Sequence, residues 1–70
     1  MHKVLSDVTG TVRKVEAQLN QQVAAGDTLL IIESMKMEIP ISAPKAGVVR
    51  EIYFAEGEIV EDGQIVAVLG

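Results

Sequence analysis

The residues of this sequence that could do chemistry are concentrated in one short segment, Glu-Ser-Met-Lys-Met-Glu at positions 33–38. The primary amine of Lys36 lies there between two methionines, with an acidic residue on each side beyond them. A catalytic lysine needs a neighbouring group or a desolvated setting that activates it, and none is evident beside Lys36. The chain also offers no paired nucleophile and base and no phosphate-binding glycine loop. Lys36 is therefore a candidate for modification rather than for catalysis.

The segment around Lys36 has the pattern of a β-hairpin. If residues 29–42 are folded about the bond between residues 35 and 36, aliphatic residues face each other near the base and polar ones face each other near the tip. The predicted cross-strand pairs are Leu30–Ile41, Ile32–Ile39, Glu33–Glu38 and Ser34–Met37. Aliphatic pairs on one face are what a hairpin rooted in a core requires. Pro40 has no amide hydrogen to donate, so it must lie at a sheet edge or an irregularity.

The tip of the predicted hairpin breaks several rules of local structure. A two-residue turn needs positive φ at both central residues and favours Asn-Gly or Asp-Gly, whereas this sequence has Met35 and Lys36. A tight turn would therefore cost about 1–2 kcal/mol per strained residue. Glu33 opposite Glu38 is a repulsive pair, and nothing in a core requires the methionines here. Because these rules fail together, the tip is a candidate functional site.

The rest of the chain has the pattern of two copies of one unit, related by an offset of 37 residues that carries Gly10 onto Gly47. The six residues from Gly10 resemble the six from Gly47, and the aliphatic block 29–32 falls on 66–69. Residues of the types that most readily take a left-handed backbone coincide as well. The aligned residues that we assign to structural turns are Gly10 and Gly47, Asn20 and Gly57, and Gly26 and Gly63. The alternative is a chance similarity within a chain rich in glycine and valine.

The chain is predicted to be all-β, because β-branched residues dominate and no segment keeps a helical period. The expected strands span residues 2–6, 11–17, 22–24, 28–34, 37–43, 48–54, 59–61 and 65–69. Val12 and Val15 have opposite parity, so a bulge or a twist is needed between them. Two copies of a four-strand unit predict two four-stranded sheets packed face to face about an approximate two-fold axis.

Length and composition limit the classes of partner. Seventy residues make one domain, residues 1–70. Six basic against ten acidic residues supply no basic face for a nucleic acid, and the adjacent Tyr53 and Phe54 face opposite sides of a strand, so they form no shared stacking platform. The absence of cysteine and a single histidine, His2, argue against a metal site. With no long apolar run and no signal-peptide pattern, we expect a cytoplasmic domain without a membrane partner.

The segment 33–38 closely resembles the attachment motif of biotinyl carrier domains, usually Ala-Met-Lys-Met, and it lies midway between two similar halves as in that family. Residues 43–49 resemble the strand that follows the family's hairpin, and the Glu-Gly at 56–57 and Asp-Gly at 62–63 resemble its closing segment. The resemblance spans the whole chain. It implies a flattened β-barrel, also called a barrel-sandwich hybrid, with biotin amide-linked to Lys36 by a biotin protein ligase.

The resemblance also implies a carrier that is not itself an enzyme. Biotin on Lys36 would be carboxylated at a biotin carboxylase site and would carry the carboxyl group to a carboxyltransferase site. The carrier would contribute effective concentration, because a tethered group finds the second site intramolecularly. Recognition by the ligase and the partner enzymes would fall to the residues that flank the lysine, which are Glu33, Ser34, Met35, Met37 and Glu38. The gap-free repeat leaves no room for the protruding thumb of some carriers, which favours the thumbless carriers and the short stand-alone attachment proteins.

Three alternatives remain open. A lipoyl carrier would share the fold and the tip lysine, but lipoyl domains typically have Asp before that lysine and Ala after it. Ser34 in place of the usual alanine is found in short stand-alone attachment proteins, so lipoate stays open as an alternative or additional group. An unmodified barrel-sandwich module for protein interaction is a second alternative. In the third, Lys36 is an ordinary solvated lysine and the methionines fold back as core filler.

Overall fold

The computed structural model describes residues 1–70, and all eight predicted strands are present, with slightly different ends. The strands are β1 (His2–Leu5), β2 (Gly10–Val15), β3 (Gln22–Val23), β4 (Thr28–Ser34), β5 (Met37–Ser42), β6 (Gly47–Ile52), β7 (Ile59–Val60) and β8 (Ile65–Leu69). β2 ends earlier than predicted because the amides of Glu16 and Ala17 both donate to the carbonyl of Leu29, at 2.9 and 3.1 Å. The fold contains no helix long and apolar enough to cross a membrane.

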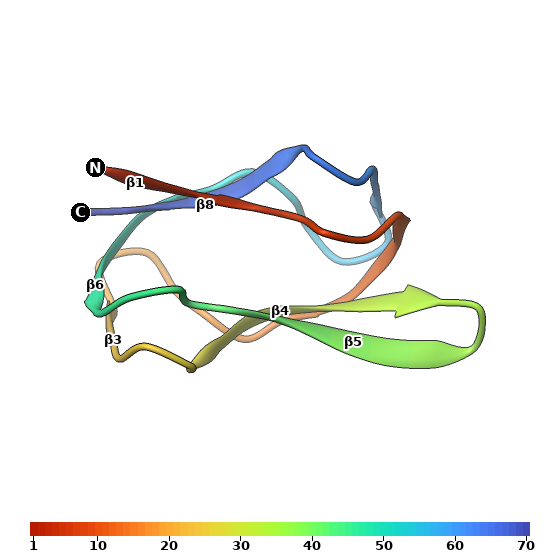
Figure 1. Ribbon diagram of the computed structural model, residues 1–70, viewed down its shortest axis with the longest axis horizontal. Helices are drawn as coiled ribbons and strands as arrows, with labels where there is room; N and C mark the ends of the chain where they lie inside the picture. The colour runs from red at the N-terminus through yellow and green to blue at the C-terminus, as the bar shows by residue number, and fades with distance from the viewer.

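The strands form two four-stranded antiparallel sheets, in the orders β1-β8-β6-β3 and β5-β4-β2-β7. Figure 1 shows the two layers facing each other, with the β4–β5 hairpin extending beyond them at one end. Both chain termini lie at the opposite end (Figure 1). The molecule is elongated, with extents of 31 × 17 × 17 Å. This is the flattened, two-sheet form that the sequence predicts.

The internal repeat is a two-fold relation between the sheets. An offset of 37 residues, which is the step from Gly10 to Gly47, carries β2, β3 and β4 onto β6, β7 and β8, and it carries β1 onto β5. The order of one sheet thereby becomes the order of the other. Hydrogen bonds repeat in the same way: Gly26 donates to the carbonyl of Ala43 and Gly63 donates to that of Ser6, both at 2.8 Å. The similarity between the halves is therefore structural and not a chance of composition.

The residues assigned to turns divide into two groups. The predicted left-handed backbone is found, with φ of 70°, 93°, 90° and 92°, at Asn20, Gly26, Gly57 and Gly63. The assignment of Gly10 and Gly47 to turns is wrong, because they begin β2 and β6. A Cβ atom on Gly10 would collide with the carbonyl oxygen of Glu33, and one on Gly47 would lie 2.9 Å from that of Gly70. Glycine at these two positions allows close approach of neighbouring backbones.

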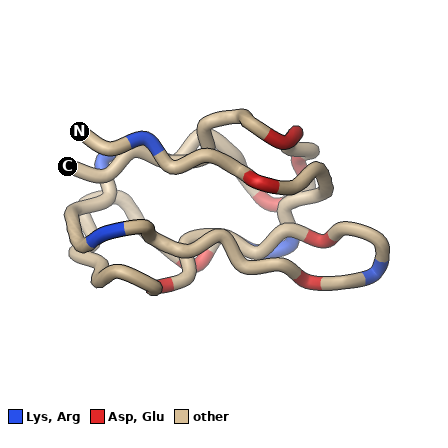
Figure 2. The backbone as a smooth tube through the Cα atoms, in the orientation of Figure 1, with Lys and Arg blue, Asp and Glu red and all other residues tan.

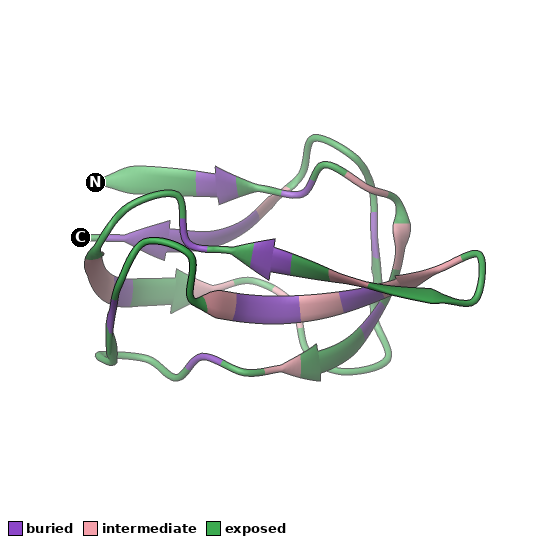
Figure 3. Ribbon diagram, turned by 60° about the horizontal axis from the view of Figure 1, so that its bottom comes forward, coloured by how far each residue is buried: buried purple, intermediate pink, exposed green.

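The core lies between the two sheets and is aliphatic. Its largest fully buried side chains are Leu29, Leu30, Ile32, Leu69, Val12, Val49, Val60 and Val66. The predicted irregularity in β2 is a bulge, because the register against β4 shifts between Val12 and Lys14. The bulge lets Val12 lie in the core and Val15 pack against it, despite their opposite parity. Figure 3 shows the buried residues within the two layers, whereas the outer part of the projecting hairpin is intermediate or exposed.

Candidate functional site

The hairpin that carries Lys36 has the predicted register. Leu30 pairs with Ile41, Ile32 with Ile39, Glu33 with Glu38 and Ser34 with Met37. Pro40 lies on β5, which is the outer strand of its sheet, so its missing amide hydrogen interrupts no central ladder. Ile32 is fully buried, its partner Ile39 is half-buried, and the residues beyond them are progressively exposed. The base of the hairpin is thus part of the core, and its outer end stands in solvent.

The turn at the tip has the strained backbone expected from the sequence. Met35 has φ of 53° and Lys36 has φ of 66°, both in the left-handed region that a two-residue hairpin turn requires. Lys36 is exposed, and its ammonium group forms no ion pair. Lys36 lies in the turn between β4 and β5, and Figure 2 shows a basic residue at the outer bend of this hairpin with an acidic residue on each strand behind it. The fold therefore presents a primary amine to solvent at its furthest point from the chain termini.

The methionines beside Lys36 are at the surface. Met35 is 89% exposed and Met37 is 59% exposed, so the alternative that they fill the core is wrong. Ser34 lies opposite Met37 and is half-buried. Unbranched, polarizable methionine side chains can adapt to differently shaped surfaces. The tip therefore has adaptable apolar contacts available on both sides of the amine.

The acidic pair behind the tip has a cationic partner that sequence analysis missed. One nitrogen of the Arg13 guanidinium, Nη1, lies 3.7 Å from Glu33 Oε1, and another, Nε, lies 3.6 Å from Glu38 Oε2. All three side chains are largely solvated, and that of Glu33 retains 42% of its accessible surface. Each ion pair therefore stabilises the fold by less than about 1 kcal/mol. A signal for this contact was present in the sequence. Val12 and Val15 require a bulge in β2, and that bulge contains Arg13.

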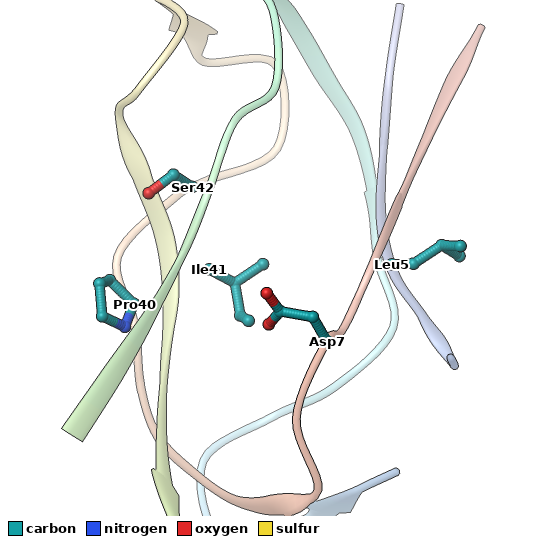
Figure 4. Close-up of a pocket in the computed structure, with 5 residues that line it drawn as sticks. All are labelled: Leu5, Asp7, Pro40, Ile41 and Ser42. Atoms are coloured by element: carbon teal, nitrogen blue, oxygen red, sulfur yellow. The ribbon is translucent and has the colours of Figure 1, made fainter. Parts of the chain in front are cut away.

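The fold also has one pocket, and it lies away from the tip. This open hollow of about 310 Å³ is lined by Leu5, Asp7, Pro40, Ile41 and Ser42. Figure 4 shows Asp7 and Ile41 directed toward each other across it, while Pro40 and Ser42 point to the other side of β5. None of the residues assigned to recognition lines this pocket. The exposed tip that carries Lys36 therefore lies outside this pocket.

The two aromatic residues lie apart from the hairpin and differ in environment. Tyr53 is exposed, whereas Phe54 is half-buried against the core; the predicted strand that would contain them ends earlier, at Ile52. The hydroxyl of Tyr53 donates a 2.6 Å hydrogen bond to Glu51 Oε1. This bond raises the pKa of Tyr53 above its ordinary value, because it stabilises the neutral phenol beside a carboxylate.

Comparison with known proteins identifies the family. Residues 5–69 match the model of the biotin/lipoyl attachment family, which is described as "Biotin-requiring enzyme". The chain belongs to this family. It is 35% identical over 66 residues to a biotinylated protein TB7.3 homolog from Mycobacterium leprae, a match that covers 94% of this chain and 93% of that one. It is 40% identical over 58 residues to a biotin/lipoyl attachment protein from Bacillus subtilis, which covers 83% of this chain and 80% of that one.

A solved structure supports the fold of this attachment domain. The crystal structure of urea carboxylase from Kluyveromyces lactis superposes with a TM-score of 0.94 at 39% identity. The match covers 99% of this chain but only 6% of the urea carboxylase. The attachment domain therefore spans most of two short relatives and a small part of a long one. Its fold class, two sheets of four strands with a flattened barrel form, agrees with that structure.

Proposed function

We propose that residues 1–70 form a biotinyl carrier domain that is biotinylated on Lys36. The observation that carries the proposal is the exposed, unpaired amine of Lys36 on a strained two-residue turn, in a domain of the biotin/lipoyl attachment family. A biotin protein ligase would activate the biotin carboxylate with ATP as an acyl-adenylate. Nζ of Lys36 would attack the carboxyl carbon, so that an amide bond forms, AMP leaves and the amine loses a proton. The amine is exposed to solvent. This exposure is consistent with an attached group that must enter the active sites of other proteins.

The residues of the carrier would hold and present the group rather than react with it. Biotin supplies a ureido ring that accepts and releases a carboxyl group. Lys36 would tether it at the outermost point of the fold, and the buried Ile32 would anchor the hairpin in the core. The exposed Met35 and Met37 would contact successive partner enzymes. A tethered group reaches each partner at high effective concentration, so the carrier needs no catalytic residue of its own.

The partners that follow from this proposal are a biotin protein ligase, a biotin carboxylase and a carboxyltransferase, in the cytoplasm. The family description supports biotin as the group. Lipoate is the second candidate, favoured by Ser34 and by a relative that is named a biotin/lipoyl attachment protein. An unmodified interaction module is the third, because the exposed methionines would also suit a protein contact.

Intact mass spectrometry of the protein purified from its own host distinguishes these functions. An added biotinyl mass supports the proposal, and fragmentation should place that mass on Lys36. An added lipoyl mass would show that the attached group is lipoate and not biotin. A mixture of the two masses would show that both groups are accepted. A chain with no added mass would contradict the carrier proposal and favour the interaction module.

Glu33→Lys should slow ligase modification while changing the melting temperature by less than about 4 °C. The carboxylate of Glu33 is solvated and contributes little to stability through Arg13, at 3.7 Å. The substitution reverses the charge on the surface that we assign to the ligase. Modification rate and thermal unfolding are measured on the same preparation. An unfolded variant, or one that is biotinylated at the normal rate, would contradict the assignment. The control is Glu16→Lys, which makes the same charge reversal outside residues 33–38.

Replacing both Met35 and Met37 with leucine should lower the rate of biotinylation or of carboxyl transfer more than it lowers stability. The side chains are exposed, and a swap of similar volume should change the free energy of unfolding by less than about 1 kcal/mol. Branched leucine adapts less well to the surfaces of several enzymes. Urea denaturation and the two rates are compared with the parent. If the double variant matches the parent in both rates, the methionines have no specific role in recognition.

A further inference from the structure

Each half of the repeat carries an arginine in its bulge. The register of β2 against β4 shifts around Arg13, and that of β6 against β8 shifts around Arg50. The offset of 37 residues carries one arginine onto the other, as it carries Gly10 onto Gly47. The repeat therefore contains two arginines in equivalent backbone positions, one in each sheet.

The two arginines meet different surroundings at equivalent places. Arg13 reaches the carboxylates of Glu33 and Glu38, at 3.7 and 3.6 Å. Arg50 lies against Gly70, where an added Cβ atom would be 2.8 Å from Arg50 Cγ, and it forms no ion pair. The offset of 37 residues carries Glu33 onto Gly70, so Gly70 is the repeat counterpart of Glu33. Both arginines thus point toward the same site of the repeat, but only in the first half does that site hold carboxylates.

We propose that Arg13 is a positioning residue for ligase recognition, which holds Glu33 and Glu38 side by side behind the turn that presents Lys36. The two glutamates are direct cross-strand partners, and like charges in that relation repel. The Arg13 guanidinium lies within ion-pair distance of both carboxylates, at 3.7 and 3.6 Å, so its positive charge offsets their mutual repulsion. The inference rests on the proposed function, since it assumes that the ligase reads this acidic pair.

The exposure of the three side chains indicates an effect on recognition rather than on folding. Solvated ion pairs contribute little to the free energy of unfolding. Without Arg13, the two carboxylates would repel each other and sample more rotamers, and the ligase would have to order them on binding. We therefore expect removal of Arg13 to raise KM for the carrier and to leave the melting temperature unchanged.

The test compares Arg13→Gln with Arg50→Gln, the matched variant at the equivalent bulge. Both are assayed as carrier substrates of a purified biotin protein ligase with biotin and ATP. Arg13→Gln should raise KM for the carrier about fivefold with kcat nearly unchanged, and Arg50→Gln should behave like the parent. Both variants should have the same melting temperature as the parent. Equal KM values for the two variants and the parent would overturn the proposal.

A second comparison separates positioning from direct contact with the ligase. In a Glu33→Gln, Glu38→Gln background Arg13 has no carboxylate to hold, so adding Arg13→Gln should cause no further rise in KM. A further rise of about fivefold in that background would show that Arg13 touches the ligase itself and would overturn the positioning role.

A measurement without ligase separates this inference from the proposed function. Backbone ¹⁵N order parameters of residues 33–38 should fall in Arg13→Gln and stay unchanged in Arg50→Gln. If the parent chain is not biotinylated but the order parameters change as expected, the carrier function fails and the contact between Arg13 and the hairpin stands. If the order parameters of the two variants are the same, Arg13 does not order the hairpin, whatever the ligase does.

Discussion

Lys36→Arg should abolish biotinylation and leave the fold intact. The guanidinium of arginine stays protonated and is a poor nucleophile, so no amide can form at position 36. Lys36 is exposed and forms no ion pair, so its replacement removes no contact that supports the hairpin. Both residue types tolerate the strained turn equally, because they are identical through Cγ. The melting temperature should therefore change by less than about 4 °C.

An avidin blot with thermal unfolding of the same sample checks this result. The matched control is Lys45→Arg, which changes an exposed lysine between β5 and β6 and should be fully biotinylated. A signal that persists in Lys36→Arg would place the attachment elsewhere, on Lys3, Lys14 or Lys45.

Gly10→Ala should destabilise the fold more than any surface change at the tip. An added Cβ atom would collide with the carbonyl oxygen of Glu33 and would lie 2.8 Å from Cγ2 of the buried Ile32. Neither neighbour can move freely, because β4 is held between β2 and β5 in the middle of its sheet. Overpacking of this kind costs about 3 kcal/mol. In a domain of this size the melting temperature should fall by about 12 °C or more.

The repeat supplies the control for this prediction. In Gly47→Ala the added Cβ atom would lie 2.9 Å from the carbonyl oxygen of Gly70 and 3.4 Å from Cβ of Leu69, so both contacts are looser than those at Gly10. Its melting temperature should fall by less than half as much as that of Gly10→Ala. Circular dichroism melts and urea titrations measure both. Equal losses for the two variants would show that the interior contact with β4 does not decide the cost.

Sequence patterns determined those features that depend on local rules. Alternating aliphatic residues and turn signals placed the strands, and the palindrome around Lys36 predicted four cross-strand pairs of the hairpin but not the register shift between Thr28 and Leu30 at its base. The offset of 37 residues predicted two sheets related by an approximate two-fold axis, and the opposite parity of Val12 and Val15 predicted a bulge or a twist, which is a bulge in the structure. The conflict between Met35–Lys36 and a tight turn indicated the tip, and both residues have the positive φ that this turn requires.

Only the tertiary structure decided which residues from distant segments meet. Gly10 was assigned to a turn, but its lack of a side chain matters because β4 passes close to it, and strand packing is invisible in a local pattern. Arg13 was missed because a bulge changes the face toward which a side chain points, and the sequence did not locate the extra residue. The sequence therefore predicted only that Glu33 and Glu38 repel each other. In the structure the guanidinium of Arg13, on β2, lies near both carboxylates. Periodicity and turn chemistry act between near neighbours in the chain, while charge balance at the hairpin depends on where a third strand brings its side chains.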